Sequence, residues 1–220
     1  GLTVPGIDNP FFATLASTVI ENLKLAGYHT LLADSLENEK DFESSLLMFR
    51  SRSVDGIIAV PVGNSSALVD EITNSIPTVL IDRYFEGTDL PYICTDNYAG
   101  GYMATEYLVG RGYRNILSIQ GVEDSTPSME RVRGFRSAID AHGDKHIEYA
   151  VVGDAFSVEN GYNQVKRLFC DEVKYDAVFA YSSTILLGAI RAFHELGIKI
   201  PEQVGLISFD NNGFLDFLDP

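Results

Sequence analysis

Basic side chains are scarce in this sequence of 220 residues, which has 16 lysines and arginines against 31 aspartates and glutamates. The formal net charge of −15 would repel a nucleic-acid backbone, so these residues by themselves are not expected to bind DNA. No apolar run approaches the roughly 18 residues of a membrane span, and Gly1 does not begin a signal peptide. The 45% hydrophobic content predicts a globular chain with one large domain or two lobes.

Cysteine is rare and histidine is not clustered. Cys94 and Cys170 lack any metal-type spacing and lie in apolar stretches, which predicts buried, reduced thiols and favours a cytoplasmic protein. The four histidines are scattered without a paired-ligand pattern, so neither a metal site nor a cofactor is expected.

Short β-rich runs alternate with longer segments of helical period, which is typical of parallel strands joined by crossover helices. We expect strands at residues 2–4, 29–33, 56–60, 78–81, 92–95, 115–120, 148–152, 177–180 and 204–209. Helices are expected at residues 12–26, 39–52, 65–74, 100–109, 130–141, 158–170 and 184–196. The glycines around Arg111 divide the strands about equally, which predicts an α/β protein with two doubly wound parallel-sheet lobes, residues 1–111 and 112–220.

Ligands of doubly wound sheets bind beyond the carboxyl ends of the strands, where loops meet helix N-termini. The residues that follow the predicted strands are therefore the candidates for function. They include Asn9, Phe11 and Phe12 after the first strand, Asp82 and Arg83 after the fourth, and Asn97 after the fifth; the second lobe supplies Arg131, Phe156, Ser182 and Asp210.

Seven segments in order resemble the LacI/GalR family of transcriptional repressors and the similar ribose-binding proteins. They begin at Asn9-Pro10-Phe11-Phe12, Ala26-Gly27-Tyr28, Asp55-Gly56-Ile57, Ile76-Pro77-Thr78, Asp96-Asn97-Tyr98, Arg131-Val132-Arg133 and Gly197-Ile198-Lys199. The resemblance extends over essentially all 220 residues. It implies a fold of the periplasmic-binding-protein-like type I, in which two lobes close on a small ligand.

The resemblance also implies which side chains hold that ligand. In the first lobe, Asn9, Phe11 and Phe12 would line the cleft, with Asp82 and Arg83 at its base. In the second, Arg131, Phe156 and Asp210 would face the ligand. Aromatic faces can cover the apolar side of a sugar ring while charged groups bind its hydroxyls, so a neutral mono- or small oligosaccharide is expected.

Structural roles compete with these assignments. Asp82 and Arg83 could form only a local ion pair, and Phe11 and Phe12 could be core residues. Arg131 could be a solvated helix charge, and Asp210 could cap the next turn. Asn97 could likewise orient its loop, so it is only a secondary candidate.

One pair departs from the family pattern. Ser182-Ser183 stands where the family commonly has Asn-Asp, so an amide that usually meets the ligand is missing, although serine can still cap a helix. Specificity identical to that of ribose-binding proteins is therefore not expected.

The resemblance further implies a larger, homodimeric repressor whose DNA-binding headpiece, returning strands and final helix lie outside these residues. Apolar residues around Phe214 and Phe217 would contribute to the dimer surface. The main alternative is a periplasmic sugar-binding protein of an ABC transporter, which has the same fold. No nucleophile elbow, phosphate loop or paired catalytic histidine supports an enzyme.

Overall fold

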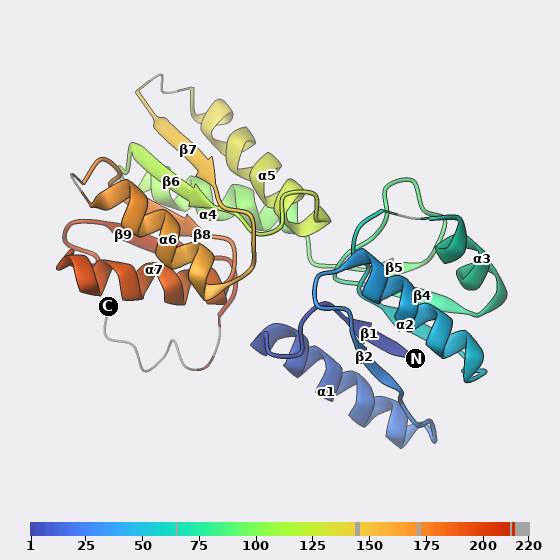
Figure 1. The fold of residues 1–220 in the computed structure, drawn as a ribbon. Helices are drawn as coiled ribbons and strands as arrows, with labels where there is room; N and C mark the ends of the chain where they lie inside the picture. The colour runs from blue at the N-terminus through green and yellow to red at the C-terminus, as the bar shows by residue number, and fades with distance from the viewer. Residues whose placement is uncertain (65, 144–145, 171–172, 212, 214–220) are drawn as a thin grey trace. The chain divides into compact units, whose positions relative to one another are not determined.

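A computed structural model describes residues 1–64, 66–143, 146–170, 173–211 and 213 of the protein. The chain forms two compact units, Gly1–Thr95 and Asp96–Pro220, which we call the first and the second unit. Each contains one parallel β-sheet with helices packed on it (Figure 1). The predicted α/β fold with two doubly wound parallel sheets is thereby confirmed.

The first unit has a five-stranded sheet in the order β2-β1-β3-β4-β5, and all neighbours are parallel. Its elements are β1 (Leu2–Val4), α1 (Pro10–Leu25), β2 (Leu32–Asp34), α2 (Glu39–Ser51), β3 (Ile57–Ala59), α3 (Ala67–Ser75), β4 (Thr78–Ile81) and β5 (Tyr92–Ile93). The strand order reverses direction between β1 and β3, which makes their carboxyl ends a switch point where ligands bind in such sheets.

The two faces of this sheet have separate hydrophobic cores. Leu2 and Val4 pack with Phe12 of α1 in one cluster, whereas Ile57 packs with Phe42 of α2 and other residues of α2 and α3 in another. Successive side chains of a strand point to opposite faces, so short apolar strands can supply both cores.

The second unit has a four-stranded parallel sheet in the order β7-β6-β8-β9. Its elements are α4 (Asn97–Gly110), β6 (Asn115–Ile119), α5 (Thr126–His142), β7 (Glu148–Val152), α6 (Val158–Phe169), β8 (Ala177–Ala180), α7 (Ser183–Leu196) and β9 (Gly205–Ser208). Helices α4 and α5 pack together, as do α6 and α7 (Figure 1). Buried Phe135, Phe179 and Phe193 are among the large residues of its single core cluster.

The division between the units falls at Thr95 and Asp96, not at the glycines around Arg111. Helix α4 belongs to the second unit because it packs closely on α5. A Cβ atom at Gly101 would crowd the backbone of Arg131, and one at Gly134 would overlap the carbonyl oxygen of Tyr98. Only glycine at both positions allows the backbones of α4 and α5 to pack this closely. The residues around Arg111 do not indicate this packing.

Helix ends follow local side-chain chemistry. Asn9 caps α1, with its side-chain oxygen 3.0 Å from the Phe11 backbone nitrogen, and Pro10 occupies the first turn, where its missing N–H is not needed. Gly27, just past the end of this helix, has a φ of +86°, the left-handed conformation that commonly ends helices. Helix α5 starts at Thr126 rather than Glu130 because Ser125 caps it.

Both cysteines are exposed, so the prediction that Cys94 and Cys170 are buried was wrong. Cys94 directly follows the edge strand β5, whose two residues are exposed, and Cys170 caps the end of α6. Apolar neighbours in the sequence did not indicate burial, because these positions lie at an edge and at a helix end. The expected dimer stretch around Phe214 and Phe217 lies outside the described residues.

Candidate functional site

Several candidate residues directly follow strands, and in each unit candidate residues form a cluster. In the first unit, Asp82 and Arg83 follow β4 directly, and both are buried. In the second unit, Arg131 lies on α5, and Asp210 follows β9. Burial of arginine and aspartate is expensive unless each charge has a partner, so the partners define what these clusters can do.

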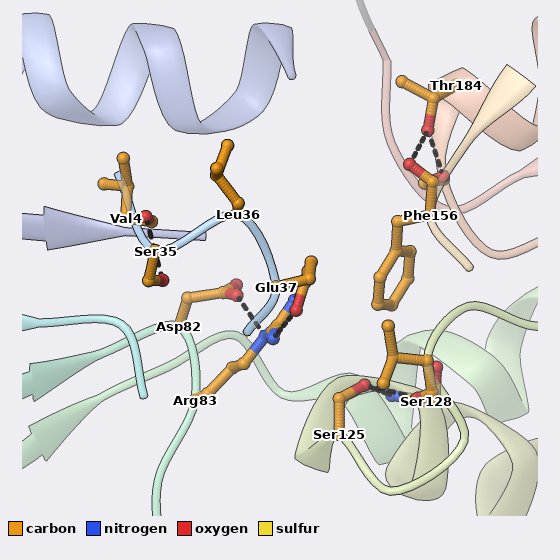
Figure 2. Close-up of polar contacts among 12 residues, drawn as sticks. Val4, Ser35, Leu36, Glu37, Asp82, Arg83, Ser125, Ser128, Phe156 and Thr184 are labelled. Carbon is orange, nitrogen blue, oxygen red and sulfur yellow. Dashed lines mark hydrogen bonds and ion pairs between the residues drawn. The ribbon is translucent and has the colours of Figure 1, made fainter. Parts of the chain in front are cut away.

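Arg83 is held by a two-point ion pair with Glu37. Its Nη1 lies 2.7 Å from Oε2 of Glu37, and its Nη2 lies 2.6 Å from Oε1. The Nε atom is 3.8 Å from Oδ2 of Asp82, and Figure 2 shows the guanidinium group between the two carboxylates. The guanidinium carbon also lies 5.8 Å from the centre of the Phe12 ring. The Arg83 guanidinium therefore forms ion pairs with the carboxylates of Glu37 and Asp82, beyond the carboxyl end of β4.

Unusual backbone conformations place both acids. Asp82 has a φ of +66°, and the Arg83 N–H donates to the Ile81 carbonyl across it, 2.7 Å away. Leu36 and Glu37 have φ values of +51° and +53°, in the left-handed region that residues other than glycine rarely adopt. Such strain persists only where the surrounding structure holds it, and it is concentrated at functional sites.

The remaining first-unit candidates have mixed positions. The Asn9 side chain caps α1, which uses its oxygen. Phe11 is 37% exposed, whereas Phe12 is 4% exposed and belongs to the core beside Leu2 and Val4. The two rings meet edge to face, with centres 5.1 Å apart. The Phe12 ring thus packs against the Phe11 ring and lies near the Arg83 guanidinium. The ligand contacts of Asn9, Phe11 and Phe12 remain predictions.

Arg131 in the second unit is also held by its own chain. Its Nε donates to the Asn97 side-chain oxygen over 2.8 Å, and its Nη1 donates to the carbonyl oxygen of Tyr181. The solvated-charge interpretation is therefore wrong, because Arg131 is 6% exposed. Asn97 is buried too, and Asp96 rather than Asn97 caps α4.

Asp210 lies in the same cluster as Arg131. Burial raises the pKa of the Asp210 carboxyl, although the positive charge of Arg131 and a hydrogen bond from the Ser183 N–H both act to lower it. The Phe209 ring lies against Arg131, with 3.5 Å between the guanidinium carbon and the ring centre. An aromatic face, a cation and an anion therefore meet at the start of α7.

Phe156 and Ser182 are the remaining candidate residues of the second unit. Figure 2 shows the Phe156 ring pointing toward the first turn of α5, where Ser125 and Ser128 lie. The Phe156 carbonyl oxygen accepts a hydrogen bond from Oγ1 of Thr184, 3.1 Å away. Ser182 caps α7, and its hydroxyl also lies 2.9 Å from that of Thr184, so serine can replace the usual amide as a cap here, as expected.

The structure thus brings Asp82, Arg83 and Phe12 together in the first unit, and Asn97, Arg131 and Asp210 in the second. Sequence reasoning missed Glu37, although it follows β2 just as the chosen residues follow other strands. It also missed Phe209, which stands beside a chosen residue. Among the described residues, no group of three or more histidines, cysteines or acids could hold a metal ion, and no helix is long and apolar enough to cross a membrane.

Comparison with known proteins identifies the family of this chain. The family of periplasmic binding proteins and the sugar-binding domain of the LacI family matches residues 1–217. The PurR repressor of Pasteurella multocida strain Pm70, described as an HTH-type transcriptional repressor, is 29% identical over 100% of this chain and 66% of its own length. The ribose operon repressor of Halalkalibacterium halodurans is also 29% identical, over 96% of this chain and 62% of its own length.

A solved structure extends the comparison to the fold. The periplasmic binding protein/LacI transcriptional regulator of Alkaliphilus metalliredigens QYMF, in complex with D-xylulofuranose, is 30% identical, with a TM-score of 0.86 over 99% of this chain and 80% of that chain. The chain described here spans about two thirds of the length of the curated relatives. It belongs to the family of periplasmic binding proteins and LacI-type sugar-binding domains.

Proposed function

We propose that this chain is the effector-binding region of a transcriptional repressor, in which a small sugar contacts both units and thereby modulates binding to operator DNA. The observation that carries the proposal is the pair of buried arginine–carboxylate clusters, one at the strand ends of each unit. Both curated relatives described above are named repressors, and one solved relative holds a ketose sugar.

The chemistry of the clusters suits a polyol. Carboxylate oxygens can accept hydrogen bonds from sugar hydroxyls, and guanidinium N–H groups can donate to them. Phe11 is partly exposed, and Phe156 is half-buried, so each can offer an aromatic face to a sugar ring. Asn9 and Ser182 serve as helix caps and would contribute only their remaining hydrogen-bonding capacity.

A sugar that touches both clusters is fully bonded only when the units close around it. It therefore stabilises the closed state by its differential contacts, which is the way a ligand shifts a conformational equilibrium. We propose that this closure is the signal carried to a DNA-binding region outside this chain, in a cytoplasmic homodimer.

Two measurements test the proposal. Calorimetric titration with pentoses, hexoses and small oligosaccharides should detect saturable binding of at least one of them. In a mobility-shift titration this chain, which carries a formal charge of −15, should not bind operator DNA. The full-length protein should bind it, and the bound sugar should change the affinity for DNA. Salt-sensitive, sequence-specific DNA binding by this chain alone would contradict the assignment, and so would a full-length protein that binds no DNA.

A further inference from the structure

We infer that Glu37 determines ligand specificity. Its carboxylate occupies the Nη1 and Nη2 donors of Arg83, which a phosphate group would need, so that the site accepts uncharged sugars and excludes sugar phosphates. The inference rests on the proposed sugar-binding function. It concerns the first unit, where Glu37, Asp82 and Arg83 lie together.

The guanidinium of Arg83 is the natural anion-binding group of this cluster. Arginine binds carboxylates and phosphates through the same two parallel N–H donors. Here the two terminal nitrogens, Nη1 and Nη2, donate to the two carboxylate oxygens of Glu37 over 2.7 and 2.6 Å. A phosphate could take that edge only by displacing Glu37.

The net negative charge of this cluster also disfavours the binding of phosphate. Asp82 lies on the Nε side of Arg83, at 3.8 Å, so the formal charges of Glu37, Asp82 and Arg83 sum to −1. Arg83 is 4% exposed and Asp82 is 9% exposed, which limits screening of their interactions by solvent. A phosphate dianion would be repelled there, whereas a hydroxyl can donate to the carboxylate lone pairs that Arg83 leaves unused.

The chain holds Glu37 in place by a well-bonded loop. Its backbone N–H donates to the Pro5 carbonyl over 2.9 Å, and the Leu36 N–H donates to Oδ1 of Asp34 over 3.0 Å. These bonds hold the left-handed conformations of Leu36 and Glu37. A side chain fixed in this way excludes competing anions better than a mobile one, because it loses little conformational freedom on pairing with Arg83.

Arg131, the arginine of the second-unit cluster, is also engaged by neighbouring groups. Arg131 donates from Nε to Asn97 and from Nη1 to the Tyr181 carbonyl, and one face of its guanidinium lies on Phe209. Its neighbour Asp210 adds a further acid to the cluster. A phosphate that met Arg131 would therefore compete with groups already bonded to it.

Inorganic phosphate is a probe that does not depend on the identity of the sugar. We expect no binding of phosphate to the unaltered chain by calorimetry at low ionic strength. Glu37→Gln keeps the size of the side chain and removes its charge, so it should create measurable phosphate binding, at least about tenfold tighter than the detection limit set with the unaltered chain. The double variant Glu37→Gln/Arg83→Gln should lose this gain.

Glu39→Gln is the matched control, because Glu39 is an exposed acid two residues away, at the start of α2. It changes the net charge equally and should not create phosphate binding. Equal gains in the Glu37 and Glu39 variants, or no gain in either, would overturn the inference. Melting curves establish that each variant is folded.

A comparison that needs no variant completes the test. The unaltered chain should bind a neutral sugar more tightly than the phosphate ester of the same sugar, by about tenfold or more. Tighter binding of the ester would overturn the role of Glu37. Failure to bind any sugar, in contrast, would contradict the proposed function, while the phosphate titration of Glu37→Gln would still decide the role of the residue.

Discussion

The guanidinium carbon of Arg131 lies 3.5 Å from the centre of the Phe209 ring, so the aromatic face supports the one arginine of the second-unit cluster. Two hydrogen bonds fix the orientation of the same guanidinium. Its Nε donates to the Asn97 side-chain oxygen, and its Nη1 donates to the Tyr181 carbonyl oxygen. Ring and hydrogen bonds together leave Arg131 in a single orientation, which lowers the entropic cost of binding a ligand.

Phe209→Leu should weaken sugar binding. The substitution keeps an apolar side chain but removes the cation–π contact, which contributes about 1–2 kcal/mol when partly desolvated, or roughly five- to thirtyfold in affinity. Calorimetry against the best neutral sugar measures the change. Tyr107→Leu is the control, since Tyr107 of α4 forms a similar contact with Arg111, 5.0 Å from ring centre to guanidinium carbon, outside the cluster. Unchanged affinity in Phe209→Leu would show that the ring does not position Arg131.

Removing a charged group of the proposed site should cost more than removing an aromatic ring of that site. Arg131→Gln should lower sugar affinity by about 1.5–3 kcal/mol, or ten- to a hundredfold, because charged hydrogen bonds are lost. Phe156→Ala should cost less, about 1 kcal/mol, because it leaves no charge without a partner. Arg133→Gln is the control, as Arg133 is exposed and pairs with Glu130 one turn away. A larger effect of Phe156→Ala than of Arg131→Gln would contradict the model of the site.

Asp210→Asn should stabilise the fold at neutral pH while weakening sugar binding. Burial raises the pKa of Asp210, so the proton binds more tightly to the folded chain than to the unfolded one. The stabilisation from this group is complete below the ordinary Asp pKa of 3.8 and is lost as the pH rises through the folded-state pKa. The gain in melting temperature of the variant should therefore be largest at neutral pH and disappear in acid.

Asp176→Asn provides the opposite control for that experiment. The Asp176 carboxylate accepts the backbone N–H groups of Arg114 and Asn115 over 2.9 and 3.0 Å, so its loss should destabilise the second unit by about 1–2 kcal/mol at neutral pH. If Asp210→Asn also lowered the melting temperature at neutral pH, the carboxylate would be a net stabiliser and the direction given for its pKa would be wrong.

Gly188→Ala should destabilise the second unit strongly. A Cβ atom at Gly188 on α7 would overlap the carbonyl oxygen of Val158 on α6, so the two helices would have to separate. Overpacking of this kind costs about 1–3 kcal/mol, measured by urea denaturation. Gly110→Ala is the control, because no atom lies within 4 Å of the corresponding Cβ. Equal stability of the two variants would mean that α6 and α7 are not packed this closely.

Much of the fold was predictable because its signals are local. The strands β4, β7 and β8 have the predicted bounds, since short apolar runs between turn residues define them. Helix boundaries were less accurate where a cap lay outside the apolar pattern, as at Ser125. The boundary between units was misplaced because it depends on packing of α4 against α5, through glycines that are 33 positions apart at Gly101 and Gly134.

The sequence by itself determined the α/β class, the succession of elements, the positions of Asp82, Arg83 and Asp210 after strands, and the position of Arg131 on a helix. Only the tertiary structure decided how their charges are neutralised. Glu37 is 46 residues from Arg83 and Asn97 is 34 residues from Arg131, so no periodicity or capping rule connects these pairs. Local patterns act over a few residues. The Glu37–Arg83 pair forms because parallel strands bring distant loops to one edge of a sheet and because Leu36 and Glu37 adopt left-handed conformations there. The Asn97–Arg131 contact forms because α4 packs on α5.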